Sequence, residues 1–347
     1  MATLAQLKLA MILPNVLLGI IFAAFLIAIM FILNLGLIWA FILAGLFILI
    51  QYLIGPAIVK ASTRLRYLKA GENPWLESTV TELAQKSGMQ PPRIALVPDS
   101  TPNAFVFGRS SSDATLAIHE GLLQQLNKDE VRGVIGHELG HIRHKDFLIM
   151  TALSSLPLLA YLIFRVTFQV AWVGGRTTRK KDEGAGLAAA LFVVSILAYV
   201  VYVIALVCVM RLSRLREHYA DAYSAYVTGA PRDLESALTK ITYGLSLAPH
   251  PEREGARTLY IGDPVLAKLE SQGIVSRKEE YDLDKDGVLD ERELELAMEK
   301  EAKSRWLTVN RWFHTHPATF SRILLLREIE NEMATGKYSN DRMYARI

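Results

Sequence analysis

Four long apolar runs constrain the fold of this 347-residue chain more than any other feature. They cover residues 9–33, 37–59, 147–164 and 187–210, and each is long enough to cross a bilayer as a helix, which takes about 20 apolar residues. Hydrophobic residues make up 51% of the chain and its mean hydropathy is +0.24, which is too apolar for an ordinary soluble protein of this size. The sequence therefore predicts a multi-pass helical membrane protein.

The first two runs are joined by a short turn signal at residues 34–36 and form a predicted transmembrane hairpin within residues 1–60. A cleaved signal peptide has a shorter apolar core followed by soluble sequence, so we expect the first run to be retained. Basic residues follow the second run directly and mark the cytoplasmic side by the positive-inside rule: Lys60, Arg64, Arg66 and Lys69. We expect a plasma-membrane protein with its soluble parts in the cytoplasm.

The second pair of runs, within residues 147–210, allows two topologies. If both runs cross the bilayer, a basic loop lies outside, against the positive-inside tendency; its residues are Arg176, Arg179, Lys180 and Lys181. The soluble flanks also carry basic residues, namely Arg143, Lys145, Arg211, Arg214 and Arg216, so the overall bias still places them in the cytoplasm. The alternative is a hairpin that enters the membrane without crossing it.

Residues 61–146 and 211–347 are the two predicted parts of one soluble domain. In the first part, apolar residues at helical spacing predict a helix over residues 73–87. Three short β-prone runs separated by Pro, Asn, Gly and Ser predict a small sheet, with strands near residues 93–98, 104–107 and 114–118. The chain is thus α+β, mostly helical with a small sheet.

The run Asn103, Ala104 and Phe105 begins the second of these strands. An exposed edge strand there would let an extended polypeptide add to the sheet through main-chain hydrogen bonds. An internal strand accounts for the same residues equally well.

A His-Glu-x-x-His motif, residues 137–141, carries the clearest chemistry. Positions i and i+4 share one face of a helix, so His137 and His141 can bind one metal ion, as in zinc peptidases. Glu138 then lies beside the open position of the metal, where it can accept a proton from the attacking water. Asn127 and Glu130 form a predicted capping box at the start of this helix. An accidental match on a surface helix is the alternative.

Two imidazoles leave a tetrahedral zinc ion short of one protein ligand, and an acidic residue on a second helix can supply it. Glu217 is the favoured candidate, and Asp221, one turn further on, can accept the N–H of a ligating imidazole. His144 competes as the third ligand because it lies on the same helix face as His137. The His-x-x-Gly-x-x-His continuation that would place the third imidazole there is missing, so we prefer Glu217.

Cysteine content and charge exclude other classes of protein and site. The one cysteine, Cys208, lies in an apolar run, which excludes a disulfide framework and a thiolate zinc site. The formal net charge is +3 and the basic residues form no long tract, so we expect no nucleic-acid partner.

The sequence resembles the HtpX-type membrane zinc metalloproteases, which are relatives of the CAAX prenyl proteases. The matching motifs are residues 103–105, the motif of residues 137–141, residues 213–221, and His314 to Pro317 with Arg322 and Ile323. The resemblance implies a zincin-like protease domain that binds zinc through His137, His141 and Glu217, uses Glu138 as the base and uses His316 to stabilise the oxyanion. It also implies quality control of membrane or misfolded proteins at the bilayer.

The chain departs from that family at an EF-hand-like insertion over about residues 274–304. Its 12-residue loop matches a calcium loop at every liganding position: Asp282, Asp284, Asp286, Val288, Asp290 and Glu293. Gly287 supplies the sharp turn at loop position 6, and Ser276 with Glu279 predicts a capped entering helix. We expect one Ca²⁺ ion here that stiffens the insertion; an acidic surface turn is the alternative.

Two other functions fit parts of the pattern. A CAAX prenyl protease would share the zinc chemistry, although four spans are few to enclose a large intramembrane chamber. A non-catalytic calcium-binding membrane scaffold would keep the insertion and tolerate the loss of Glu138.

Overall fold

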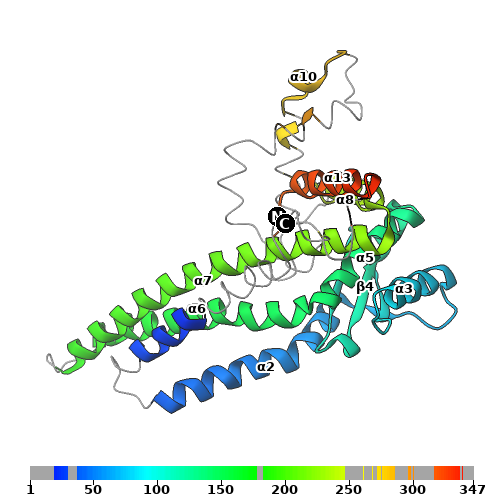
Figure 1. Ribbon diagram of the computed structural model, residues 1–347. Helices are drawn as coiled ribbons and strands as arrows, with labels where there is room; N and C mark the ends of the chain where they lie inside the picture. Colours follow the sequence, from blue (N-terminus) through cyan, green and yellow to red (C-terminus); the bar gives the residue numbers. More distant parts are fainter. Residues whose placement is uncertain are drawn as a thin grey trace. The chain divides into compact units, whose positions relative to one another are not determined.

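The computed structural model describes most of the chain, including all three predicted zinc ligands. The described residues are 19–29, 37–177, 183–246, 261, 268, 272–274, 276–285, 296–297, 300, 316–336 and 338. They form two compact units, one of residues 1–7, 56–147 and 213–347 and the other of residues 8–55 and 148–212. Helices α2 (Leu37–Thr63), α6 (Asp146–Thr177) and α7 (Glu183–Thr228), labelled in Figure 1, contribute to both, because the unit boundaries after residues 55, 147 and 212 fall inside them.

A four-stranded mixed sheet lies in the first unit, with strand order β1-β2-β4-β3. The strands are β1 (Arg66–Tyr67), β2 (Arg93–Val97), β3 (Ala104–Phe107) and β4 (Thr115–His119). β2 pairs with β4 in parallel, and the other two pairs are antiparallel. All three predicted β-prone runs are strands, and β3 is an edge strand of the sheet that the described residues form.

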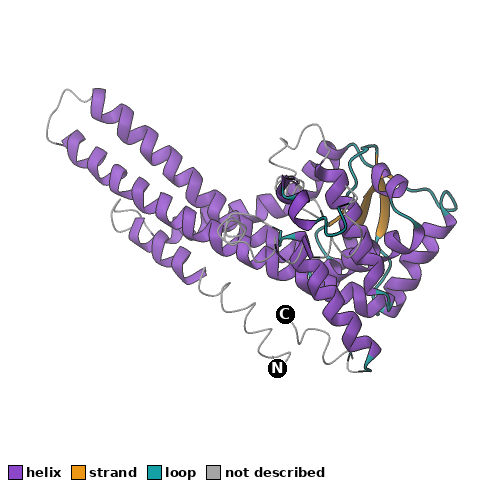
Figure 2. Cartoon of the chain, turned by 90° about the horizontal axis from the view of Figure 1, so that it is seen from above, coloured by secondary structure: helices purple, strands orange, loops and turns teal. Residues whose placement is uncertain are grey.

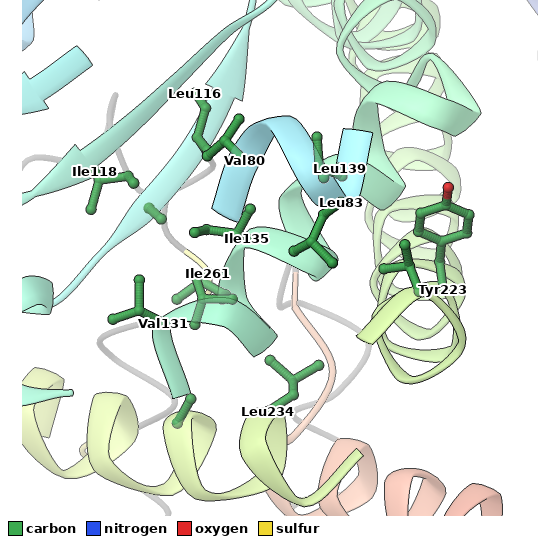
Figure 3. Packing of buried hydrophobic residues seen from close by; sticks show 14 of the residues in the cluster. Val80, Leu83, Leu116, Ile118, Val131, Ile135, Leu139, Tyr223, Leu234 and Ile261 are labelled. Carbon is green, nitrogen blue, oxygen red and sulfur yellow. The ribbon is translucent and has the colours of Figure 1, made fainter. Parts of the chain in front are cut away.

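The sheet is apolar on both faces. Residues of one face, such as Leu116 and Ile118, pack with α3 (Pro74–Lys86) and α5 (Lys128–His144) in the main core, as Figure 3 shows. Residues of the other face form a separate cluster: Leu65, Ala95, Val97, Phe105, Phe107 and Ala117. Because neighbouring residues of a strand point to opposite faces, β3 and β4 are anchored on both sides and their register is set.

Helix α5 is defined at both ends by its sequence. Asn127 accepts from the Glu130 backbone N–H at 2.9 Å and Glu130 accepts from the Asn127 N–H at 2.8 Å, which confirms the predicted capping box. Lys145 ends the helix in the left-handed conformation, with φ of 58°. The metal-binding motif therefore occupies the last two turns of a firmly bounded helix.

Two glycines of α5 allow α7 to approach closely. A Cβ on Gly140 would lie 3.0 Å from Ala220 Cα, and one on Gly136 would lie 2.8 Å from Ser224 Oγ. The Ser224 hydroxyl also donates to the Gly133 carbonyl at 2.7 Å. This close packing is what lets side chains of α7 reach those of α5. The other helices that the described residues of this unit form are η1 (Ser111–Asp113), α4 (Glu120–Gln125), α8 (Pro231–Ser246), α10 (Lys278–Tyr281) and α13 (Thr319–Ala334).

Within the described residues, three helices are long and apolar enough to cross a membrane: Ala44–Thr63, Ile149–Val173 and Gly186–Thr228. They overlap three of the four predicted spans, those of residues 37–59, 147–164 and 187–210. The predicted span of residues 9–33 is described only as the apolar helix Gly19–Ile29. Many of their large apolar side chains are exposed, as expected for helices that face lipid. Figure 2 shows that most of the described chain is helical.

The start of the predicted calcium loop is described, and its entering helix differs from the prediction. α10 is preceded by Arg277, which makes no side-chain cap, and the Ser276 hydroxyl donates to the Gly273 carbonyl at 3.1 Å. The predicted Ser276 cap is wrong, because α10 starts one residue later than predicted, after Arg277, and the Ser276 hydroxyl instead bonds back to the preceding turn. Asp282 and Asp284 are described, whereas Asp286, Gly287, Val288, Asp290 and Glu293 lie outside the described residues.

Candidate metal centre

Helices α5 and α7 bring two imidazoles and one carboxylate together. The Nε2 atoms of His137 and His141 lie 3.1 Å apart. The Glu217 carboxylate lies 3.6 Å from His137 Nε2 through Oε2 and 3.7 Å from His141 Nε2 through Oε1. Ligand atoms of a tetrahedral zinc ion, at about 2.0–2.1 Å from the metal, are separated by roughly 3.3 Å. The three side chains are thus spaced as ligands of one ion.

A buried atom in this group supports that fit. Glu217 is 6% exposed, and its Oε2 atom has no hydrogen-bond partner among the described residues. The Arg322 guanidinium, with Nη1 3.3 Å from Oε2, offsets part of the cost of burying this oxygen without a hydrogen bond, and a metal ion would offset more of it. The donor set of two imidazoles and a carboxylate is one that zinc commonly takes in hydrolytic sites.

Glu138 lies at the same place, as expected from its position directly after His137. The ligand atoms of His137, Glu138 and His141 lie within 4.8 Å of one another. Glu138 is 3% exposed, and its burial raises the pKa of the carboxyl group even though the two imidazoles act in the opposite direction. A carboxyl group with a raised pKa beside a metal site is suited to accepting and releasing a proton.

Each histidine is held from behind by a carboxylate. His137 Nδ1 lies 2.9 Å from Asp221 Oδ1, and His141 Nδ1 lies 2.8 Å from Asp146 Oδ2. An ionised carboxylate can only accept, so each ring donates through Nδ1 and keeps Nε2 free to bind a metal. Asp221 was predicted for such a contact. Asp146 was missed, and its signal is that it directly follows the residue that ends α5, five positions after His141.

Arg322 is a second residue of the site that was singled out only as part of a motif. Its Nε and Nη2 atoms donate to the two oxygens of Asp221 at 2.8 and 2.7 Å, and its Nη1 lies 3.3 Å from Glu217 Oε2. Burial by itself would raise the pKa of Asp221, but the Arg322 charge and the His137 hydrogen bond lower it well below its usual range. Asp221 is therefore held as a carboxylate.

The two remaining histidines lie differently. His316 is 4% exposed, and its Nδ1 is 3.5 Å from Glu217 Oε2, so it belongs to the same group of side chains. The alternative third ligand, His144, packs its ring against Tyr219 and Tyr223, with centroid distances of 5.9 and 5.7 Å. Burial lowers the pKa of His144 to about 4, which keeps the ring neutral in that aromatic environment.

The side chains of the predicted substrate strand are buried. Ala104 and Phe105 belong to the clusters on opposite faces of the sheet. Asn103 is 1% exposed, and its Oδ1 accepts from the Ile261 backbone N–H at 2.9 Å. A polypeptide could therefore contact this part of β3 through main-chain atoms rather than through these three side chains.

Comparisons with known proteins agree with this geometry. The model of peptidase family M48 matches residues 70–330, which is most of the chain. The chain belongs to this family. A protease HtpX homolog from Methanothermobacter thermautotrophicus is 38% identical over 243 residues, which cover 70% of this chain and 88% of the relative. Another from Thermococcus kodakarensis is 32% identical over 295 residues, or 84% and 86% of the two chains.

A solved structure shares the fold of this chain. The crystal structure of S. mikatae Ste24p matches with a TM-score of 0.51 at 16% identity, over 93% of this chain and 67% of that one. Membership of family M48 makes the protein a protease with polypeptide substrates, and the predicted HtpX-type family is confirmed. Its long apolar helices make it a membrane protein.

Proposed function

We propose that the protein is a zinc metalloendopeptidase whose zinc ligands are His137, His141 and Glu217. The observation that carries this proposal is the convergence of the three side chains at 3.1–3.7 Å, with Glu217 Oε2 buried and without a hydrogen-bond partner. Asp146 and Asp221 keep the two rings in the tautomer that presents Nε2, and Arg322 orients Asp221 and Glu217.

Glu138 is the general base in this proposal. A zinc ion bound at the three ligands supplies Lewis acidity, which lowers the pKa of water and polarises the scissile carbonyl. Glu138 accepts the proton from the attacking water and passes it to the leaving amine. Both ring nitrogens of His316 are buried and have no hydrogen-bond partner within the part of the chain that the structure describes, so His316 can donate to the oxyanion of the tetrahedral intermediate.

We assign the edge of β3 as the place where an extended substrate adds to the sheet. β3 ends the strand order, and α5, which carries Glu138, follows β4 after the short helix α4. In sequence, the candidate span Ile149–Val173 starts only a few residues after His141. Connectivity this short favours cleavage close to the membrane surface, in membrane or misfolded proteins. The basic residues after the second apolar run favour the cytoplasmic face of the plasma membrane.

We further propose that the insertion binds one calcium ion through Asp282, Asp284, Asp286, Val288, Asp290 and Glu293. The support is the sequence match at each liganding position, with glycine at the sharp turn. The described start of the loop is anchored, because Tyr281 belongs to a buried cluster with Phe320 and Ile323 of α13. Equal activity of wild type and an Asp282→Ala, Glu293→Ala variant across a calcium titration would exclude modulation by this ion.

The deciding experiment is metal analysis of the purified protein combined with casein cleavage. Wild type should contain about one zinc per chain and cleave casein, whereas Glu217→Ala should lose both properties. Glu138→Gln should keep the zinc and lose cleavage, which would exclude a non-catalytic scaffold. A CAAX-type activity is tested separately with a prenylated peptide; hydrolysis of that peptide without casein cleavage would replace the proposed function with the prenyl-protease alternative.

A further inference from the structure

We propose that Asn103 is a positioning residue that ties the start of β3 to the support of the metal ligands through the main chain of Ile261. The inference deepens the proposed function and rests on it. It also changes the role expected for Asn103, whose side chain would act on the protein's own backbone rather than on the substrate.

The connection has two hydrogen bonds, one on each side of Ile261. The Ile261 N–H donates to Asn103 Oδ1 at 2.9 Å, and the Ile261 carbonyl accepts from Arg322 Nη1 at 2.5 Å. All three residues are almost fully buried, with 1–2% exposure. The Ile261 side chain lies in the main core (Figure 3), so this short stretch of backbone is held by packing as well. We call this arrangement the Ile261 bridge.

One end of the Ile261 bridge is fixed to the sheet. The Asn103 carbonyl accepts from the His119 N–H at 2.9 Å, which pairs the residue before β3 with the last residue of β4. The Asn103 side chain is therefore carried on a backbone whose register is already set. Since Ile261 supplies the donor, the atom of Asn103 that faces it must be the amide oxygen.

The other end of the Ile261 bridge is the metal centre. Arg322, which binds the Ile261 carbonyl, also binds both oxygens of Asp221 and approaches Glu217. Asp221 in turn accepts from His137. A continuous series of buried hydrogen bonds thus joins the substrate-strand end of the sheet to His137, and an ion pair from Arg322 extends it to Glu217.

The consequence is a fixed distance between the substrate strand and the metal. A substrate bound along β3 takes its position from that strand, whereas Glu138 and the metal take theirs from α5 and α7. Catalysis loses large factors when the reacting groups are misplaced by about 1 Å. Loss of the Ile261 bridge should therefore lower kcat with little change in KM, because main-chain pairing of the substrate survives.

Two substitutions separate this role from direct contact with substrate. Asn103→Ala removes the acceptor, and we expect kcat to fall about 5- to 100-fold, the effect of losing one buried hydrogen bond, with zinc content unchanged. Asn103→Asp keeps an oxygen at the same place and should recover most of the lost rate. If the amide N–H₂ of Asn103 instead held the substrate, Asn103→Asp would be as defective as Asn103→Ala, and the proposal would fail.

Hydrogen exchange provides a readout that does not need activity. In the full-length protein, the peptide that contains Ile261 should exchange slowly in wild type and in Asn103→Asp, and faster in Asn103→Ala. Unchanged exchange in Asn103→Ala would overturn the proposal even if activity fell. Faster exchange in a protein that proves not to cleave any peptide would keep the Ile261 bridge and reject the proposed function. If Asn103→Ala does not fold, Asn103→Ser takes its place in the comparison with Asn103→Asp. The proposal then predicts faster exchange in Asn103→Ser, and slow exchange with a retained rate in Asn103→Asp.

Discussion

The two histidines of α5 are each held by a carboxylate, yet the two supports are built differently. His137 is fully buried and donates to Asp221, whose oxygens both accept from Arg322 of α13. The His141 side chain is 17% exposed and donates to Asp146, whose other oxygen accepts from Arg216. The support of His137 therefore joins α5, α7 and α13. The support of His141 joins α7 to Asp146, which comes shortly after α5 in the sequence.

The two arginines also differ in how fully they are used. Arg322 donates from Nε, Nη1 and Nη2, whereas Arg216 donates from Nη1 to Asp146 and finds no hydrogen-bond partner for Nε or Nη2 in the described residues. A saturated buried network is rigid, and one with unmatched donors already carries a cost. The comparison teaches that the His137 side of the site is the more firmly organised, and the following substitutions test this.

Arg322→Ala should have the largest effect. It leaves the Asp221 carboxylate buried without its cation, which costs about 3–5 kcal/mol when one partner of a buried pair is removed. Denaturant unfolding of the detergent-solubilised protein measures the loss. Arg216→Ala is the matched control and should cost less, because two of its three donor groups have no partner to lose. Equal losses would remove the proposed difference between the supports.

Asp221→Asn should weaken zinc binding about 10- to 100-fold, the usual effect of losing a carboxylate behind a ligating histidine. The amide cannot accept as strongly from His137, and it leaves Arg322 with less negative charge to bind. Competition with a calibrated chelator measures the affinity. Retention of wild-type affinity would show that Arg322 and α7 packing orient His137 without this carboxylate.

Asp146→Asn tests the weaker support and should reduce zinc affinity by no more than about tenfold. His141 is partly exposed, so water can replace part of the lost interaction. The same chelator competition applies. A larger loss than that of Asp221→Asn would reverse the ranking of the two supports.

Glu130→Gln tests a carboxylate on α5 that is distant from the metal and should have the smallest effect. Burial by itself would raise the pKa of Glu130, but hydrogen bonds from Lys240, Ser236 and the Asn127 backbone outweigh it and lower the pKa. The carboxylate therefore stabilises the fold above the unfolded pKa of about 4.3, and this stabilisation is lost as pH falls through the folded pKa. We expect a loss of about 1 kcal/mol at pH 7 that shrinks on acidification.

Unfolding curves at pH 7 and at acidic pH measure the Glu130 effect, with zinc content as the control. Zinc content should not change, because Glu130 belongs to the opposite end of α5 from the metal motif. A loss of stability that is the same at both pH values would mean that packing rather than charge is responsible.

Local features of this chain were predictable because local geometry decides them. The α5 capping box needs only residues three positions apart, and the three strands follow from short β-prone runs between turn residues. The same local reasoning failed at Ser276, because α10 starts after Arg277 and the Ser276 hydroxyl bonds back to Gly273. The placement of His137 and His141 on one helix face likewise follows from helical spacing.

By itself, the sequence determined the family, through motifs spread along the chain. It also determined the long apolar helices and the pair of histidines one turn apart, since these depend on residues close together in the chain. Only the tertiary structure decided what stands behind those histidines. Arg322 meets Asp221 across 101 positions and His137 across 185, and Asn103 meets Ile261 across 158. No local pattern encodes such pairings, because burial and the close packing of α5 against α7 select them among many possible partners of a charged or polar side chain.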